Sequence, residues 1–408
     1  MAAGSPVSAG SRSVYTAEGF DWYASLPAAP AARVGDLLVV SGQVPLDREM
    51  NLVAPGDLVA QTRHVFESTG RLLAAAGATF DDVVDVMAFT QDPRQIGTVL
   101  DVARLYFERD YPAWSISSFL GSYVPGVLVA VQVIAHLGPG PKTCFTPDSL
   151  RWWGSRPVSG GCRKGDLLFV SAQSAIDGDG NVRFPGDHCA QARASYEGIL
   201  EVVEMAGGSV DDILDFTSFH QDLRGAEATF TDVYMPEVLK GDRSDERAPS
   251  TSHVGTPGLE KPGQLGAFRA VADLSPGRRT AFTPELNWWK NVLPLAGGVK
   301  KENGRLVTVA GQVACAADQS IVAPGDTAGQ VRYILTEIRE VLEGFGGSLD
   351  NVVGVLSFHK DPRAWQDAMH VAAEVFPAGA GPAWTPVSMP ALWMEGYLHE
   401  IAAIAILR

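Results

Sequence analysis

One carboxylate interrupts the last apolar run of the chain, residues 397–407, and it belongs to Glu400. Similar apolar runs occur at 127–137 and 265–274, and alignment on the glycine before each run sets Glu400 level with Ala130 and Ala267. A buried carboxylate without a partner is costly, so Glu400 needs a function or a polar partner. Two interpretations stay open: an acid or base in a cleft, or a structural hydrogen bond or ion pair.

Two other side chains are candidates for the same chemistry. Arg269 lies two residues after Ala267, and residues two apart in a strand share a face. It either binds an anionic group or pairs with an acid of a neighbouring unit. His253 lies two residues after Thr251, in a stretch rich in glycine and proline. It either shuttles protons near neutral pH or is a surface histidine.

Composition bounds the classes of function. The chain has 408 residues, a mass of 43.4 kDa, 46% hydrophobic residues and a formal net charge of −15. Its acidity argues against a nucleic-acid partner or an anionic membrane surface. The four cysteines form no CxxC or Cys/His cluster, and P-loop, GxSxG, HExxH and dinucleotide motifs are absent, so we expect no metal and no cofactor. Without a signal-like or membrane-spanning segment, the expected location is the cytoplasm.

A threefold internal repeat is the most informative feature of the sequence. A Pro-Gly-Asp turn, with a glutamine and an arginine at fixed offsets, begins at Pro55, Pro185 and Pro324. The block before this turn reads VGDLLVVSGQ at 34–43, KGDLLFVSAQ at 164–173 and NGRLVTVAGQ at 303–312. A third block follows it at 77–94, 207–224 and 346–363. Because the order of the blocks is preserved, the chain is predicted to contain three related units.

Each unit is predicted to have an α+β fold. In the first unit the SGQ-type run is a strand, and the Pro-Gly-Asp turn starts a helix that ends at Gly77. A strand follows over 83–90, then a second helix over 95–109, and the apolar run closes the unit as a buried strand. The helices are expected on one face of a sheet. The predicted division is a disordered tail at 1–13 and units at 14–140, 141–278 and 279–408.

The order of these blocks resembles the Rid/YjgF family of reactive-intermediate imine deaminases, and the resemblance covers nearly the whole chain three times. It implies a chorismate mutase-like unit that assembles as a homotrimer around a central β-barrel, with ligand sites in the clefts between subunits and no cofactor. Three copies in one chain would form an intramolecular pseudo-trimer, so no obligate homotrimer is expected. Fusion would also free the three clefts to diverge.

The chain departs from the family at the positions that bind substrate. Deaminases of the family carry an arginine in the turn before the last strand, where it holds a substrate carboxylate. The matching positions are Trp114, Thr251 and Trp384. An indole offers a flat apolar surface for an aromatic or hydrophobic ligand, although tryptophans that merely fill inactive clefts are the alternative. The family glutamate of the last strand matches Arg269 in register, and Glu400 lies two residues before that register in the third unit.

Tryptophan pairs mark the starts of the second and third units, and Trp393 precedes the last strand. Stacking between units explains most of these rings, but two or more in one cleft would form an aromatic box for a planar ligand. His220 and His359 occupy equivalent positions in the second and third units, which favours a structural role at a strand end.

The sequence therefore predicts a diverged enzyme that acts on a small, aromatic or hydrophobic imine or enamine by hydrolysis, deamination or proton transfer. The predicted catalytic residues are Glu400 and His253. The predicted substrate-binding residues are Trp114, Thr251, Trp384, Arg269 and Trp393. A non-catalytic small-molecule-binding protein is the alternative, and the expected partner in both cases is a small molecule.

Overall fold

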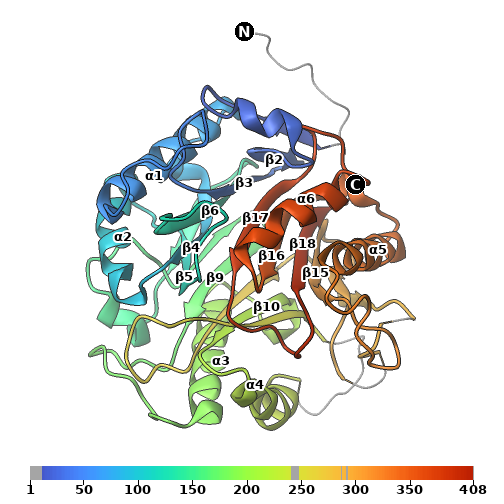
Figure 1. Cartoon of the computed structure of the whole chain (residues 1–408). Coiled ribbons are helices and arrows are strands. Elements are labelled where there is room, and N and C mark those ends of the chain that lie inside the picture. The colour runs from blue at the N-terminus through green and yellow to red at the C-terminus, as the bar shows by residue number, and fades with distance from the viewer. Residues whose placement is uncertain (1–11, 240–247, 286, 291–292, 408) are drawn as a thin grey trace.

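The computed structural model describes residues 12–239, 248–285, 287–290 and 293–407. Three six-stranded sheets follow one another along the chain, and each belongs to one repeat unit. Figure 1 shows the units as blue, green and orange-to-red sectors, with helices at the periphery and strands toward the middle. Within the described residues, no helix is both long and apolar enough to span a membrane.

The three units repeat one order of elements. Unit 1 contains β1 (Ser13–Tyr15), β2 (Ala31–Val34), β3 (Leu37–Gln43), α1 (Leu58–Ala75), β4 (Val83–Thr90), α2 (Ile96–Ala103), β5 (Ala113–Ser118) and β6 (Val129–His136). Unit 2 contains β7 (Lys142–Phe145), β8 (Gly161–Lys164), β9 (Leu167–Gln173), α3 (His188–Met205), β10 (Ile213–His220), α4 (Arg224–Thr229), β11 (Ser250–Gly255) and β12 (Gly266–Asp273). Unit 3 contains β13 (Arg279–Phe282), β14 (Gly298–Lys301), β15 (Leu306–Val313), α5 (Thr327–Gly344), β16 (Val352–His359), α6 (Trp365–Ala372), β17 (Ala383–Ser388) and β18 (His399–Ile406).

Each sheet is mixed. The strand order in unit 1 is β1-β2-β3-β6-β4-β5, and units 2 and 3 follow the same order. Only the pair at one edge is parallel, β4 with β5 and its equivalents β10 with β11 and β16 with β17. A parallel pair needs a crossover connection, and α2, α4 or α6 lies in that connection. The fold is therefore α+β, as the repeat pattern predicted.

The long helix of each unit starts where the Pro-Gly-Asp turn predicts. The glycine of the turn has a positive φ, and the following aspartate caps the helix by accepting a backbone N–H three residues later. The capping residues are Asp57, Asp187 and Asp326. The second helix is shorter than predicted: α2 ends at Ala103, and a 3-10 turn capped by Asp92 precedes it. In unit 2, α4 continues as a π-helix over Phe230–Val238, which sequence periodicity does not distinguish from an α-helix.

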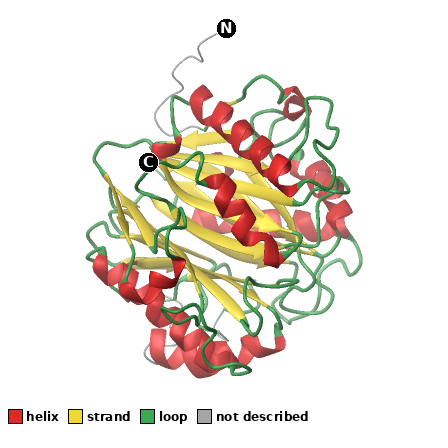
Figure 2. Cartoon of the chain, turned by 90° about the vertical axis from the view of Figure 1, so that its left-hand side faces the viewer, coloured by secondary structure: helices red, strands yellow, loops and turns green. Residues whose placement is uncertain are grey.

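Every sheet buries both faces. One face packs on the helices of its own unit and forms three separate cores. Figure 2 shows these helices lying over the sheets. The opposite faces meet in cores that all three units share, where Val39, Phe169 and Leu306 come together. Strands buried on both faces explain why the final runs of the units read as continuously apolar.

The units contact one another in a cycle. β5 packs against β9, β11 against β15, and β17 against β3. Each contact includes a bond from a backbone N–H to a serine hydroxyl of the adjacent unit, from Trp114 to Ser171 (2.7 Å), from Gly311 to Ser252 (3.0 Å) and from Trp384 to Ser41 (2.8 Å). All three inter-unit contacts are thus made within one chain.

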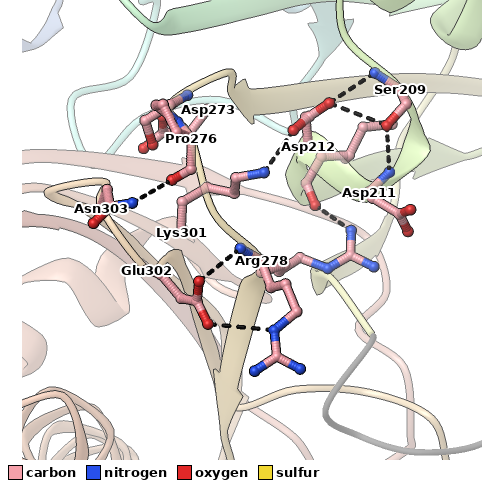
Figure 3. A network of polar contacts seen from close by, with 12 residues as sticks. Ser209, Asp211, Asp212, Asp273, Pro276, Arg278, Lys301, Glu302 and Asn303 are labelled. Carbon is pink, nitrogen blue, oxygen red and sulfur yellow. Dashed lines mark hydrogen bonds and ion pairs between the residues drawn. The ribbon is translucent and has the colours of Figure 1, made fainter.

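Ion pairs support two of the three junctions. Lys301 contacts Asp212 at 2.6 Å between units 2 and 3, as Figure 3 shows, and Lys164 contacts Asp82 at 3.2 Å between units 1 and 2. Both lysine side chains are nearly buried. The matching residues at the third junction are Val34 and Asn351. The third junction therefore differs from the other two in its electrostatics.

A deeply buried ion pair links units 1 and 2 near the centre of the molecule. Arg269 of β12 contacts Asp85 of β4 at 2.7 Å, and their side chains are 6% and 1% exposed. Arg269 also lines a small internal cavity to which all three units contribute, together with Asp215 and Thr217. Of the two interpretations of Arg269, the structure shows the pairing with an acid of a neighbouring unit.

Removing one partner of this pair should destabilise the protein strongly. Arg269→Met leaves Asp85 buried without a counter-charge, and we expect the free energy of unfolding to fall by about 3–5 kcal/mol. The double variant Arg269→Met/Asp85→Leu removes both charges and should be more stable than Arg269→Met alone. Urea unfolding followed by circular dichroism measures both effects. If the double variant loses as much stability as Arg269→Met and Asp85→Leu lose together when measured singly, the two charges do not interact.

Candidate functional site

Glu400 lies at the cleft between units 2 and 3. It is the second residue of β18, it pairs in register with Val313 of β15, and it is 3% exposed. The backbone N–H of His253, across the unit boundary, donates a hydrogen bond to its carboxyl group. Burial raises the pKa of Glu400 well above its ordinary value, and this one hydrogen bond opposes the rise only in part. Burial therefore favours the protonated form of the carboxyl group, and in this form it can act as an acid.

A glycine makes room for this carboxyl group. Gly311 lies on β15, and a Cβ atom built there would overlap the carboxylate of Glu400. Unit 2 has Ala172 at the position of Gly311 and Ala267 at the position of Glu400, so a side chain is tolerated where the carboxylate is missing. Gly311 and Glu400 thus form a matched pair within β15 and β18.

His253 is the other titratable group of the cleft. It lies on β11, half-buried, and its Nδ1 lies 2.6 Å from Oγ of Ser218 on the neighbouring strand. Burial lowers the pKa of His253 to about 4, so its imidazole is neutral near pH 7. Its Nε2 is buried and has no hydrogen-bond partner among the described residues. A neutral imidazole with a free nitrogen can serve as a base.

Aromatic rings enclose both groups. The pocket between units 2 and 3 is lined by Phe230, Thr251, His253, Trp288, Trp289, Leu293, Leu295, Ala310, Gly311, Val313, Trp393, Tyr397 and Glu400. None of these lining residues is an arginine or a lysine. The indole N–H groups of Trp288 and Trp289 are buried, and neither has a partner among the described residues. The pocket therefore offers flat apolar walls with a few unused polar groups.

A second cavity adjoins this pocket. The pocket beside Glu400 has a volume of about 50 Å³, and the adjoining cavity has about 670 Å³. Phe230, Trp288, Leu293 and Trp393 line both cavities. A small reacting group fits beside Glu400, and any larger part of the same molecule has space in the adjoining cavity.

Four of the seven predicted site residues line this pocket, namely Glu400, His253, Thr251 and Trp393. Trp384 lies instead in the core of unit 3, where its indole N–H donates to Ser357 at 2.8 Å. Arg269 is paired with Asp85, outside the pocket. Trp114 lines the equivalent cleft between units 1 and 2.

That equivalent cleft has a different chemistry. Ala267 replaces the glutamate, and Ile116 replaces His253. Arg156 and Glu260 line it and form an ion pair across it, with distances of 3.0 and 2.5 Å. The acid and the imidazole are thus present together in the cleft between units 2 and 3 and not in the one between units 1 and 2.

Sequence reasoning missed several residues of the pocket. The repeat pattern favours stacking between units for Trp288 and Trp289. The structure instead places both in one pocket with Trp393, which matches the alternative of several tryptophans in one cleft. Phe230 enters from the π-helix, whose position no motif marked. Among the described residues, no group of three or more His, Cys, Asp or Glu side chains is placed to hold a metal ion.

Comparison with known proteins places these units in a family. The family described as Endoribonuclease L-PSP matches residues 24–137, 155–265 and 295–407. A RutC family protein from Pyrococcus abyssi is 31% identical over 110 residues, which cover 27% of this chain and 86% of that protein.

Two solved structures illustrate the similarity at different scales. A Yersinia pestis protein of the conserved Rid family is 27% identical and covers 31% of this chain and 98% of its own, with a TM-score of 0.27. A chorismatase is 12% identical and covers 80% of this chain and 93% of its own, with a TM-score of 0.53. At that identity, the likeness to the chorismatase concerns the fold alone.

Replacing Glu400 by glutamine should change how stability depends on pH. Because the folded protein holds a proton on Glu400 after the unfolded chain has lost it, the stability of the wild type falls as pH rises above about 4.5. Glu400→Gln cannot ionise, so its stability relative to the wild type should rise as pH increases above about 5. Chemical unfolding at several pH values measures this difference. A difference that stays constant with pH would mean that Glu400 is not buried as an acid.

The fit between Gly311 and Glu400 can be tested with a double-mutant cycle. Gly311→Ala should destabilise the wild type by about 1–3 kcal/mol, because the new methyl group overlaps the carboxyl group. In the Glu400→Ala background the same substitution should cost much less, as unit 2 carries alanine at both positions. Equal costs in the two backgrounds would show that the two positions are independent.

Proposed function

Since the chain belongs to the Rid/YjgF (L-PSP) family and contains three copies of its unit, we propose that it is a diverged, cofactor-independent enzyme of this family. It acts on a small, neutral, aromatic or hydrophobic imine or enamine in the cleft between units 2 and 3. One observation carries the proposal: an acid and a base, Glu400 and His253, line one aromatic-walled pocket.

The protonation states of the two groups support opposite roles. Burial raises the pKa of the Glu400 carboxyl and lowers the pKa of the His253 imidazole. We therefore assign the proton at rest to Glu400 and the free lone pair to His253. An acid and a base whose environments shift their pKa values in this way are suited to complementary proton transfers.

The pocket lining supports a neutral ligand. Family deaminases hold a substrate carboxylate with an arginine, whereas Thr251 occupies that position in this cleft. No lysine or arginine among the lining residues replaces it. The rings of Trp288, Trp289 and Trp393 suit a planar apolar group, and the free indole N–H groups suit an acceptor atom on it.

Hydrolysis of an imine would proceed in two proton-balanced steps. Nε2 of His253 takes a proton from water as the oxygen bonds to the imine carbon, and Glu400 gives its proton to the imine nitrogen. Collapse of the resulting carbinolamine returns the hydroxyl proton to the Glu400 carboxylate, while the proton on His253 passes to the departing amine. Both side chains end as they began, and the products are a carbonyl compound and ammonia or an amine.

The arrangement of the three units supports a self-contained particle. Cyclic contacts among the sheets and a central cavity lined by all three units favour a closed barrel at the middle of the molecule. We expect the protein to exist as a monomer of about 43.4 kDa, because the interfaces that a homotrimer would make between chains are already made within this chain.

A non-catalytic role is the second candidate, and the missing family arginine favours it. The same pocket would then bind a planar molecule without turning it over. Glu400 would serve only as a hydrogen-bond donor to that molecule.

Ammonia release from a freshly generated neutral aromatic imine, such as that formed by oxidation of benzylamine, tests the proposal. We expect the wild type to accelerate release above the spontaneous rate, and to act more weakly on the anionic imine of alanine. Glu400→Gln should lose about 10²-fold or more of the acceleration. Glu337→Gln, a buried glutamate on α5 outside the pocket, is the matched control and should retain activity. Saturable binding without acceleration by the wild type would instead support the non-catalytic role.

A further inference from the structure

We propose that Ser218 and His220 form a proton relay with His253 and decide which of its ring nitrogens carries the proton. The inference rests on the proposed function in one respect, the role of His253 as the base of the pocket. Ser218 and His220 are therefore positioning residues that act through His253.

The three side chains lie in an unbroken line of hydrogen bonds. Ser218 of β10 lies directly opposite His253 in the parallel pair of β10 and β11. Its Oγ is 2.6 Å from Nδ1 of His253 and 2.8 Å from Nε2 of His220. Ser218 is fully buried and His220 is 1% exposed, so water does not compete for these bonds.

The hydroxyl of Ser218 has one proton, so it can donate to only one of the two rings. The other ring then donates to Ser218, and in this way the tautomer of one ring influences the tautomer of the other. If Nδ1 of His253 donates to Ser218, then Ser218 donates to His220, and Nε2 of His253 has a free lone pair. If His220 donates to Ser218, then Ser218 donates to His253, and Nε2 of His253 carries a proton. The first arrangement presents a base to the pocket, and the second presents a donor.

The ring nitrogen at each end of this line has no further hydrogen-bond partner among the described residues. These atoms are Nε2 of His253 and Nδ1 of His220, and both are buried. The ring of His220 packs against Phe268 of β12, and the titratable groups that influence its pKa are His253 and, from the start of α3, His188. His188 is only half-buried and also interacts with Asp222.

Burial keeps the relay neutral at rest. It lowers the pKa of His220 well below the ordinary value and the pKa of His253 to about 4, and the nearby His253 and His188 lower the pKa of His220 further. Two neutral rings supply one N–H and one lone pair each, which is what transfer through a single hydroxyl requires.

The relay accounts for proton movement in the proposed step. When Nε2 of His253 takes a proton from water, its Nδ1 proton moves to Ser218, and the hydroxyl proton of Ser218 moves to Nε2 of His220. The reverse transfer returns a proton to the departing amine. No net proton is gained or lost over the cycle.

The other two units lack the complete relay. Unit 3 keeps Ser357 and His359 at 2.8 Å, but the second partner of Ser357 is the indole N–H of Trp384, which donates to it and does not titrate. Pro386 of β17 lies opposite Ser357, where unit 2 has His253. In unit 1 the matching pair is Ala88 and Ile116. The line reaches a pocket only in unit 2, which supplies His253 to the cleft that contains Glu400.

Nitrogen-15 NMR of the imidazole groups tests the relay without any substrate. In the wild type, replacing His220 by asparagine should shift the ring nitrogens of His253 toward a different tautomer. In the Ser218→Ala background the same replacement should leave His253 unchanged. Ser357→Ala is the matched control and should not affect His253. Identical shifts of His253 with and without the Ser218 hydroxyl would overturn the relay.

A kinetic measurement separates failure of the relay from failure of the proposed function. Ser218→Ala should lower kcat for the neutral imine by about 10-fold or more with little change in KM, and should change the pH profile of kcat. Ser218→Thr keeps the hydroxyl group and should restore both. If Glu400→Gln abolishes turnover while Ser218→Ala leaves kcat and its pH profile unchanged, the function stands and the relay is wrong. If no variant turns over any imine, the NMR result still decides the relay.

Discussion

The packing of each unit's parallel edge strand against the next unit is the contact on which the rest of the structure depends. β5, β11 and β17 each meet a strand of the following unit, and the faces of the three sheets that point away from the helices share common cores. A single unit would expose this apolar face, and the shared cores remove it from water. The pocket at Glu400 lies at the contact between β11 and β15, so it exists only because units 2 and 3 are joined.

Fusion of the units lets one contact differ from the others. A homotrimer repeats each residue three times, whereas this chain has Glu400 once, in the same pocket as His253, with alanine, isoleucine and proline at the matching positions of the other units. The same asymmetry extends to the centre, where Arg269 and Asp85 pair across one boundary. Burying titratable side chains such as these is unfavourable unless each has a polar partner or a function. In the pocket, burial favours a protonated carboxyl group and an uncharged imidazole, which suits Glu400 and His253 to the roles proposed for them.

The sequence was sufficient for the architecture and for part of the site. Repeated blocks predicted three α+β units, because the Pro-Gly-Asp cap and the apolar strand are local signals that can be recognised from neighbouring residues in the sequence. Glu400 stood out because a titratable group in an apolar run must be explained, and His253 because it lies two residues after Thr251, the position of the family arginine. Their meeting could not be predicted, because it depends on the packing of two units more than 100 residues apart. Trp384 shows the converse: its position matched the family turn, but its indole turns into the core and binds Ser357. The relay could not be predicted from the sequence, because no motif marks Ser218. Its role follows only from the strand register that places it beside His253.

The central claim is that Glu400 is a protonated acid in contact with the ligand of the pocket. Infrared difference spectroscopy of the wild type against Glu400→Gln at neutral pH tests it directly, because a protonated carboxyl group and a carboxylate absorb at separate frequencies. The account predicts a protonated carboxyl band that is lost in Glu400→Gln and shifts when a neutral aromatic amine or amide analogue is added. A carboxylate band at neutral pH, or a carboxyl band that does not respond to such analogues, would contradict it.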